Sequence, residues 1–195
     1  MNINVFSAEA CQLAEEKGLW QKRGGDDLKT VLSLIHCEWS EALEEDRNGG
    51  RVIGFQRSGV MEATPDKPIG YAVELVDGII LICSMMNRYG CKFDESDTNE
   101  FIEWVPKKWG VFPVSYIKTM RLPWLVFYLH ELTSKVNANF QHGGVGGTSA
   151  ALEPLRIAAG LAWIWIELHG LDPEAILIKK HEYNKHREYM HGKKY

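Results

Sequence analysis

The chain of 195 residues is long enough for one domain with a substantial core, or for two fused half-domains. Its 45% hydrophobic and 25% charged residues are ordinary for a globular protein. A net charge of −4 argues against nucleic acid or an anionic membrane as the main partner, so a polyanionic substrate would need local basic residues or a bridging cation.

The cysteines and the apolar runs indicate the cellular compartment of the protein. Cys11, Cys37, Cys83 and Cys91 are scattered without a C-x-x-C pair, which favours reduced thiols over a disulfide framework or a zinc site. The N-terminus lacks the basic and apolar regions of a signal peptide, and the longest apolar run, residues 78–83, is too short to cross a bilayer. These features predict a soluble, cytoplasmic protein with no membrane partner.

Apolar periodicity predicts helices through most of the first half. Ser7 is a candidate N-cap, Pro68 is placed to open a later helix, and Gly90 is placed to end it. The clearest signal is a 3.6-residue apolar period after Asp27, which is typical of a long amphipathic helix. The predicted elements are a helix over residues 7–18, a helix over residues 27–46, a loop with a short strand or turn over residues 48–66, and a helix over residues 69–88.

The second half repeats this layout more loosely. Its predicted elements are a connector over residues 94–121, a helix opened by Pro123, a glycine-rich loop over residues 141–149, a helix over residues 152–169, and a last helix from Pro173 to the C-terminus. The segment LPWLVFYLHELTSKV resembles LKTVLSLIHCEWSEAL, with His130 matched to His36 and Ser134 to Ser40. An internal duplication explains this match, and chance similarity between amphipathic helices is the alternative.

Two carboxylate pairs fall on neighbouring predicted helices. On a helical wheel, Glu38, Glu41 and Glu45 lie along one edge of the apolar stripe of their helix. The next helix is apolar nearly all round and is therefore predicted to be buried, yet it carries Glu74 and Asp77. A buried carboxylate needs a partner or a metal ion, because desolvation of each charge costs several kcal/mol.

Four converging carboxylates would repel one another unless a hard divalent cation neutralised them. Ligation by oxygen alone suits Mg²⁺ or Mn²⁺, and such ions recruit phosphates. The alternative is that Glu38 and Glu41 are solvated, while Glu74 or Asp77 pairs with an arginine. The occurrence of both pairs together favours the metal site.

The motifs E-W-S-E (38–41) and E-L-V-D (74–77) resemble the E-x-x-E and E-x-x-D signature of the MazG-like, all-α nucleoside triphosphate pyrophosphohydrolase superfamily, which includes the dimeric dUTPases. The ending K-H-E-Y-N-K-H-R-E-Y-M-H-G-K-K (180–194) is similar to that of small bacterial and phage members. The resemblance covers residues 7–90 and 160–195. About 80 residues separate the E-x-x-D helix from the K-x-x-Y-N helix, where small members have almost none.

The resemblance implies hydrolysis of a nucleoside triphosphate between the α- and β-phosphates, which releases the monophosphate and pyrophosphate. Glu38, Glu41, Glu74 and Asp77 would hold Mg²⁺, or Mn²⁺, to polarise the phosphoryl group and activate a water. Glu41 or Glu45 would instead orient that water as the general base.

The resemblance also implies a binding site for the triphosphate on the last helix. Lys180, Asn184 and Arg187 share one face there, and Lys193 follows in the tail. Trp20 would border the base by analogy with the family. The alternatives are a solvated basic helix end and a tryptophan that belongs to the core.

The implied fold is all-α, with a MazG-like four-helix-bundle core and a degenerate duplication that makes the chain a fused pseudo-dimer. Residues 1–93 would form the catalytic half, and residues 94–195, which lack a second carboxylate set, would form the degenerate half of one compact unit. The fusion would replace part of the dimer-of-dimers assembly that is usual in the family, and the predicted assembly of whole chains is a homodimer. A catalytically impaired nucleotide-binding or regulatory module and a purely structural helical protein are the alternative functions.

Overall fold

The computed structural model describes residues 1–20, 27–56, 66–93, 101–109, 113–141 and 147–188. Helices dominate this part of the chain, which confirms the all-α prediction. The elements are α1 (Ile3–Glu16), α2 (Asp27–Arg47), β1 (Gly54–Gln56), β2 (Lys67–Ile69), α3 (Tyr71–Arg88), α4 (Phe101–Trp109), α5 (Val114–Thr119), α6 (Leu122–Gln141), α7 (Gly147–Leu168) and α8 (Pro173–Lys185).

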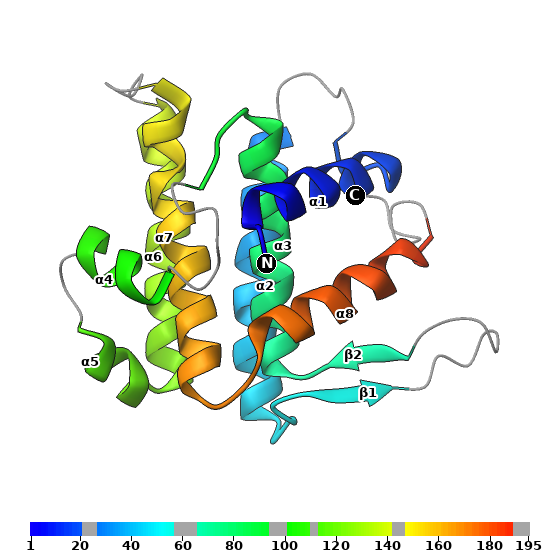
Figure 1. Ribbon diagram of the computed structural model, residues 1–195, viewed down its shortest axis with the longest axis vertical. Coiled ribbons are helices and arrows are strands. Elements are labelled where there is room, and N and C mark those ends of the chain that lie inside the picture. Colours follow the sequence, from blue (N-terminus) through cyan, green and yellow to red (C-terminus); the bar gives the residue numbers. More distant parts are fainter. Residues whose placement is uncertain (21–26, 57–65, 94–100, 110–112, 142–146, 189–195) are drawn as a thin grey trace.

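Four long helices form the bundle at the centre of the molecule (Figure 1). Helix α2 packs against α3 and α6, and helix α7 packs against α3 and α6, so that each helix has two neighbours in the bundle. Helices α1 and α8 cover the remaining surface of α3, while α4 and α5 pack on α7. Because α3 is covered by α1, α2, α7 and α8, it is the most enclosed helix of the bundle.

The first helix begins earlier than the sequence predicted. Asn2 caps α1, because its side-chain oxygen accepts hydrogen bonds from the backbone N–H groups of Asn4 and Val5. Ser7 is not the cap: it is buried inside the helix, where its hydroxyl donates to the carbonyl of Ile3. Helix α2 follows the predicted bounds closely.

A β-hairpin precedes α3 and changes its predicted start. Strands β1 and β2 are antiparallel, so Pro68 lies in a strand and not at a helix start. Gly70 separates β2 from α3 with a φ of 114°, and a Cβ there would lie 2.5 Å from the carbonyl oxygen of Arg51. This glycine therefore lets the start of α3 lie against the segment that links α2 to β1, where the N–H groups of Tyr71 and Ala72 donate to the carbonyls of Arg51 and Val52.

Three predictions for the second half were wrong in detail. The connector contains two helices, α4 and α5, which pack against α7. Helix α7 begins at Gly147, within the predicted glycine-rich loop, and carries Pro154 inside it. Helix α8 ends at Lys185 and does not continue to the C-terminus, while its start at Pro173 agrees with the prediction.

The interface between α2 and α6 contains two polar contacts. The indole N–H of Trp39 donates to the hydroxyl of Thr133 over 3.1 Å, and both residues are fully buried. The rings of His36 and His130 stack, and their Nδ1 atoms lie 2.7 Å apart in a hydrogen bond. These contacts hold α2 against α6 next to Glu38 and Glu41.

None of the described helices combines the length and the apolar character needed to cross a membrane. The four cysteines are all free, in agreement with the prediction from their spacing.

Candidate metal centre

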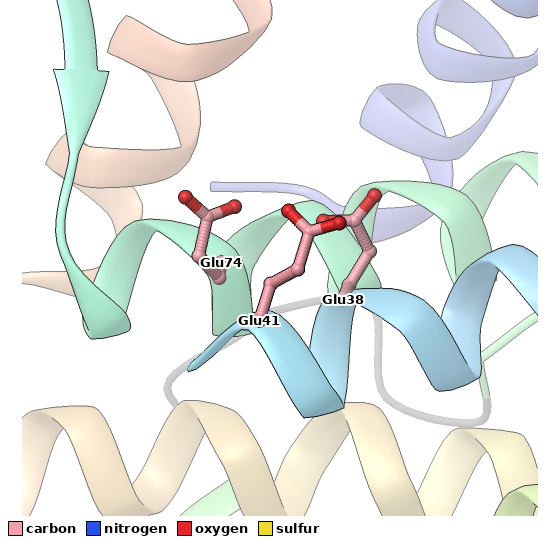
Figure 2. A group of neighbouring side chains, drawn as sticks. All are labelled: Glu38, Glu41 and Glu74. Carbon is pink, nitrogen blue, oxygen red and sulfur yellow. The ribbon is translucent and has the colours of Figure 1, made fainter. Parts of the chain in front are cut away.

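Three carboxylates from α2 and α3 meet at the outer side of these two helices (Figure 2). Glu38 and Glu41 are one turn apart on α2, and Glu74 lies in the first turn of α3. One oxygen of each carboxylate lies within 4.8 Å of the others. Glu74 is buried, Glu38 is half-buried and Glu41 is exposed, so the cluster is reached from the side of Glu41.

The spacing of α2 and α3 depends on a glycine. A Cβ at Gly78 would lie 2.2 Å from the ring of Trp39, so only glycine lets the two helices approach this closely. Gly78 is four residues after Glu74, and Trp39 follows Glu38 directly. The close approach therefore lies next to the carboxylates and sets the distance between them.

Burial and mutual repulsion weaken the acidity of two of these carboxyl groups. Burial raises the pKa of Glu38 to about 9, and the charges of Asp77, Glu41 and Glu74 contribute to this shift. Burial, with Asp77 as the main charged neighbour, raises the pKa of Glu74 to about 7. Without a cation the cluster therefore retains protons at neutral pH.

Asp77 has a different partner from the three clustered glutamates. Its Oδ2 lies 2.6 Å from the ammonium nitrogen of Lys180, which reaches it from α8. The side chain of Lys180 is 3% exposed and that of Asp77 is 13% exposed. Burial alone would lower the pKa of Lys180, but the carboxylates of Asp77, Glu74 and Glu38 outweigh it and raise this pKa.

The donor set fits a hard divalent cation. All three groups offer carboxylate oxygens, which are the ligands that Mg²⁺ and Mn²⁺ prefer. Octahedral Mg²⁺ with bonds of about 2.1 Å needs ligand oxygens about 3–4 Å apart, so small side-chain rotations from the observed arrangement would suffice. Within the described parts of the chain this is the one group of three acidic, histidine or cysteine side chains placed to hold an ion.

Two of the other predicted site residues lie away from the cluster. Glu45 is not part of it and lies at the end of α2, where a Cβ at Gly50 would come within 2.6 Å of its carboxylate. Trp20 is buried against the far part of α3, where its indole N–H donates to Ser84 over 2.8 Å and Arg88 lies over its ring.

The C-terminal candidates have mixed placements. Asn184 lies one turn after Lys180 in α8, and its buried Oδ1 has no hydrogen-bond partner among the described residues. Arg187 lies beyond the end of α8, and its carbonyl, like that of Lys185, accepts a hydrogen bond from the ammonium group of Lys17. Lys193 lies outside the described residues. The predicted shared helical face therefore holds for Lys180 and Asn184 only.

The sequence did not reveal one cation beside the cluster. Lys67, in β2, is close enough that its charge lowers the pKa of Glu74. Its position depends on the pairing of β2 with β1. The sequence predicted a short strand or turn over residues 48–66, where β1 lies, but it placed residue 67 in no strand.

A hollow of about 260 Å³ adjoins the cluster along α2. It is lined by His36, Cys37, Ser40, Glu41 and Glu44. Glu41 belongs to both the hollow and the cluster, so the two are continuous. A second hollow of about 600 Å³ lies over α1 and Lys92 and contains none of the clustered carboxylates, so we assign it no part in the site.

Searches of protein families, of curated proteins and of solved structures each found no match to this chain. The fold and the site by themselves define a helical-bundle protein with an interhelical acidic cluster that suits a hard cation.

Proposed function

We propose that the protein is a Mg²⁺-dependent nucleoside triphosphate pyrophosphohydrolase of the MazG-like type. The observation that carries this proposal is the convergence of Glu38, Glu41 and Glu74 within 4.8 Å, with two of their pKa values raised. Without a cation, the repulsion and desolvation of these carboxylates destabilise the folded protein, and a bound divalent ion would offset this destabilisation. The motif resemblance supplies the reaction, because the carboxylates alone would suit other phosphoryl chemistry.

Each residue has a proposed task. Glu38, Glu41 and Glu74 hold the ion, which when bound polarises the α-phosphoryl group and makes a nearby water more acidic. Glu41, the exposed member, would hold the ion through one carboxylate oxygen and leave the other to accept the proton of the attacking water, while Glu45 lies outside the cluster. Asn184, which the resemblance assigns to the triphosphate, lies one turn after Lys180 on α8, and its buried Oδ1 has no hydrogen-bond partner among the described residues.

Pyrophosphate release from a panel of ribo- and deoxynucleoside triphosphates, with and without Mg²⁺, tests this function. We expect turnover of at least one triphosphate that requires the ion and is lost in Glu38→Gln and Glu74→Gln. Asp46→Asn is the matched control, because Asp46 is exposed on the same helix and lies outside both the cluster and the hollow. No Mg²⁺-dependent release from any member of the panel would contradict the proposal.

The second candidate function is nucleotide binding without turnover. It is favoured by Asp77, which the resemblance assigns to the metal but which is already ion-paired with Lys180. Calorimetry distinguishes the two functions. Nucleotide binding that survives in Glu38→Gln, together with no pyrophosphate release by the unchanged protein, would favour the binding module.

We also propose that α6 and α7 descend from a copy of α2 and α3, so that the chain is a fused pseudo-dimer. In a two-fold assembly, residues on the axis contact their own equivalents. His36 contacts His130 and Trp39 contacts Thr133, and both pairs are separated by the same 94 residues, as expected for matched positions. The cytoplasmic location and a homodimer of whole chains remain predictions.

A further inference from the structure

Asp77 and Lys180 form a buried ion pair immediately beside the carboxylate cluster. The two charged atoms are 2.6 Å apart, and Lys180 is almost fully enclosed between α8 and α3. Its ammonium group lies 5.9 Å from the centre of the Tyr183 ring. The lysine is therefore held in place on several sides and is not a mobile surface side chain.

This ion pair changes the charge balance of the site. Glu38, Glu41, Glu74 and Asp77 carry four negative charges when ionised, and one divalent ion neutralises half of them. Lys180 supplies a third positive charge and interacts with Glu38 and Glu74 as well as with Asp77. A second divalent ion beside Asp77 would have to occupy the space of the ammonium group and would be repelled by it.

Resting on the proposed function, we propose that Lys180 takes the place of a second metal ion, so that the site binds one divalent cation per chain. The ion is held by Glu38, Glu41 and Glu74, and the ammonium group of Lys180 is the fixed counter-charge of Asp77. In this arrangement Asp77 is not a ligand of the ion. Lys180 is a positioning residue, because it acts through Asp77 and does not touch the reacting atoms.

Mn²⁺ binding followed by electron paramagnetic resonance tests this assignment without requiring turnover. We expect one Mn²⁺ per chain in the unchanged protein, and a second Mn²⁺ in Lys180→Met, where the space and the charge beside Asp77 become available. The double variant Asp77→Asn with Lys180→Met should return to one ion. Lys179→Ala, an exposed change on the same helix, is the matched control and should keep one ion.

Asp77→Asn keeps the test decisive if Lys180→Met does not fold. Its Mn²⁺ affinity should stay within about threefold of the unchanged protein, well short of the about 10- to 100-fold loss that follows removal of a group supporting the metal. A larger loss, or two ions in the unchanged protein, would overturn the inference while leaving the proposed function intact. No bound Mn²⁺ at all would contradict the proposed function itself.

Discussion

Glu38 shows how a single side chain connects the fold to the proposed chemistry. Burial and its acidic neighbours raise its pKa from 4.5 to about 9, so the folded protein keeps a proton that the unfolded chain releases between these pH values. Because the folded state binds more protons in this window, the free energy of unfolding falls as pH rises through it. Glu74 behaves in the same way up to a pKa of about 7.

The first prediction follows from this linkage. In the absence of metal, Glu38→Gln should raise the free energy of unfolding by about 1–3 kcal/mol at a pH of about 8.5, because the amide cannot ionise. At a pH near 4.5 the two proteins should be similarly stable. Denaturant unfolding in the presence of a chelator measures the free energies of unfolding of both proteins at the two pH values, with Glu44→Gln as the control. A variant that is less stable at the higher pH would contradict the prediction.

The second prediction concerns the metal. Mg²⁺ must displace the protons of Glu38 and Glu74, so its binding should release protons and strengthen with pH. We expect Mg²⁺ to raise the melting temperature more at a pH of about 8.5 than at about 6. Thermal denaturation with Mg²⁺ or a chelator at the two pH values measures this difference. Equal shifts in melting temperature at both pH values would show that the buried carboxyl groups do not ligate the ion.

At the scale of helices, the approach of α2 to α3 at Gly78 determines the geometry of the cluster. The ring of Trp39 occupies the space where any side chain at this position would begin. Trp39 cannot easily move away, because it is fully buried and donates a hydrogen bond to Thr133 on α6. The packing of α2 against α3 therefore sets the positions of the proposed metal ligands.

The third prediction is that Gly78→Ala destabilises the fold by about 1–2 kcal/mol, because overpacking outweighs the better helix propensity of alanine. It should also weaken Mg²⁺ binding by moving Glu74 away from Glu38. Asn87→Ala is the control, since Asn87 is exposed on the same helix. Denaturant unfolding and metal titration give the two readouts. An unchanged metal affinity would show that the packing at Gly78 does not control the positions of the metal ligands.

The fourth prediction concerns the contact between α2 and α6. Thr133→Val removes the acceptor of the buried Trp39 N–H and should cost about 1–3 kcal/mol of the free energy of unfolding. Thr133→Ser keeps the hydroxyl and should recover most of this loss. Chemical denaturation of the three proteins measures the difference. Equal losses in the valine and serine variants would contradict the prediction, because serine keeps the hydroxyl that accepts from Trp39 and valine does not.

At the scale of the whole molecule, the two halves of the sequence form one bundle. Helix α3 is buried nearly all round, because the second half supplies α7 and α8 as two of its neighbours. The second half also supplies Lys180, the counter-charge of Asp77. The site and the core of the first half therefore both depend on the second.

The fifth prediction is that residues 1–93 do not fold on their own. Removing α7 and α8 would expose the apolar surface of α3 and take away Lys180, the ion-pair partner of Asp77, so the fragment should lack a cooperative thermal transition. The whole chain should show a single transition. Circular dichroism during heating compares the two. A fragment that melts cooperatively would identify the first half as an independent domain.

Much of the fold was predictable from the sequence, because it depends on local signals. The 3.6-residue period placed α2, the uniform apolar character of α3 predicted its burial, and Pro173 marked the start of α8. Two of the wrong predictions, both in the first half, occurred where a signal had two interpretations. Ser7 and Pro68 both suit a helix start, but Asn2 and Gly70 take that position, since the packing of α1 and the hairpin decides the start.

From the sequence alone, helical periodicity places Glu38 and Glu41 on one edge of their helix and Glu74 on a definite face of the next, which predicts that these carboxylates converge. How their charges are balanced depends on the packing of helices that are distant in the chain. Lys180 is more than a hundred residues from Asp77 in the chain, yet the crossing of α8 over α3 brings their charges to 2.6 Å. Ion pairing depends on distance in space and on exclusion of water, neither of which periodicity along the chain encodes.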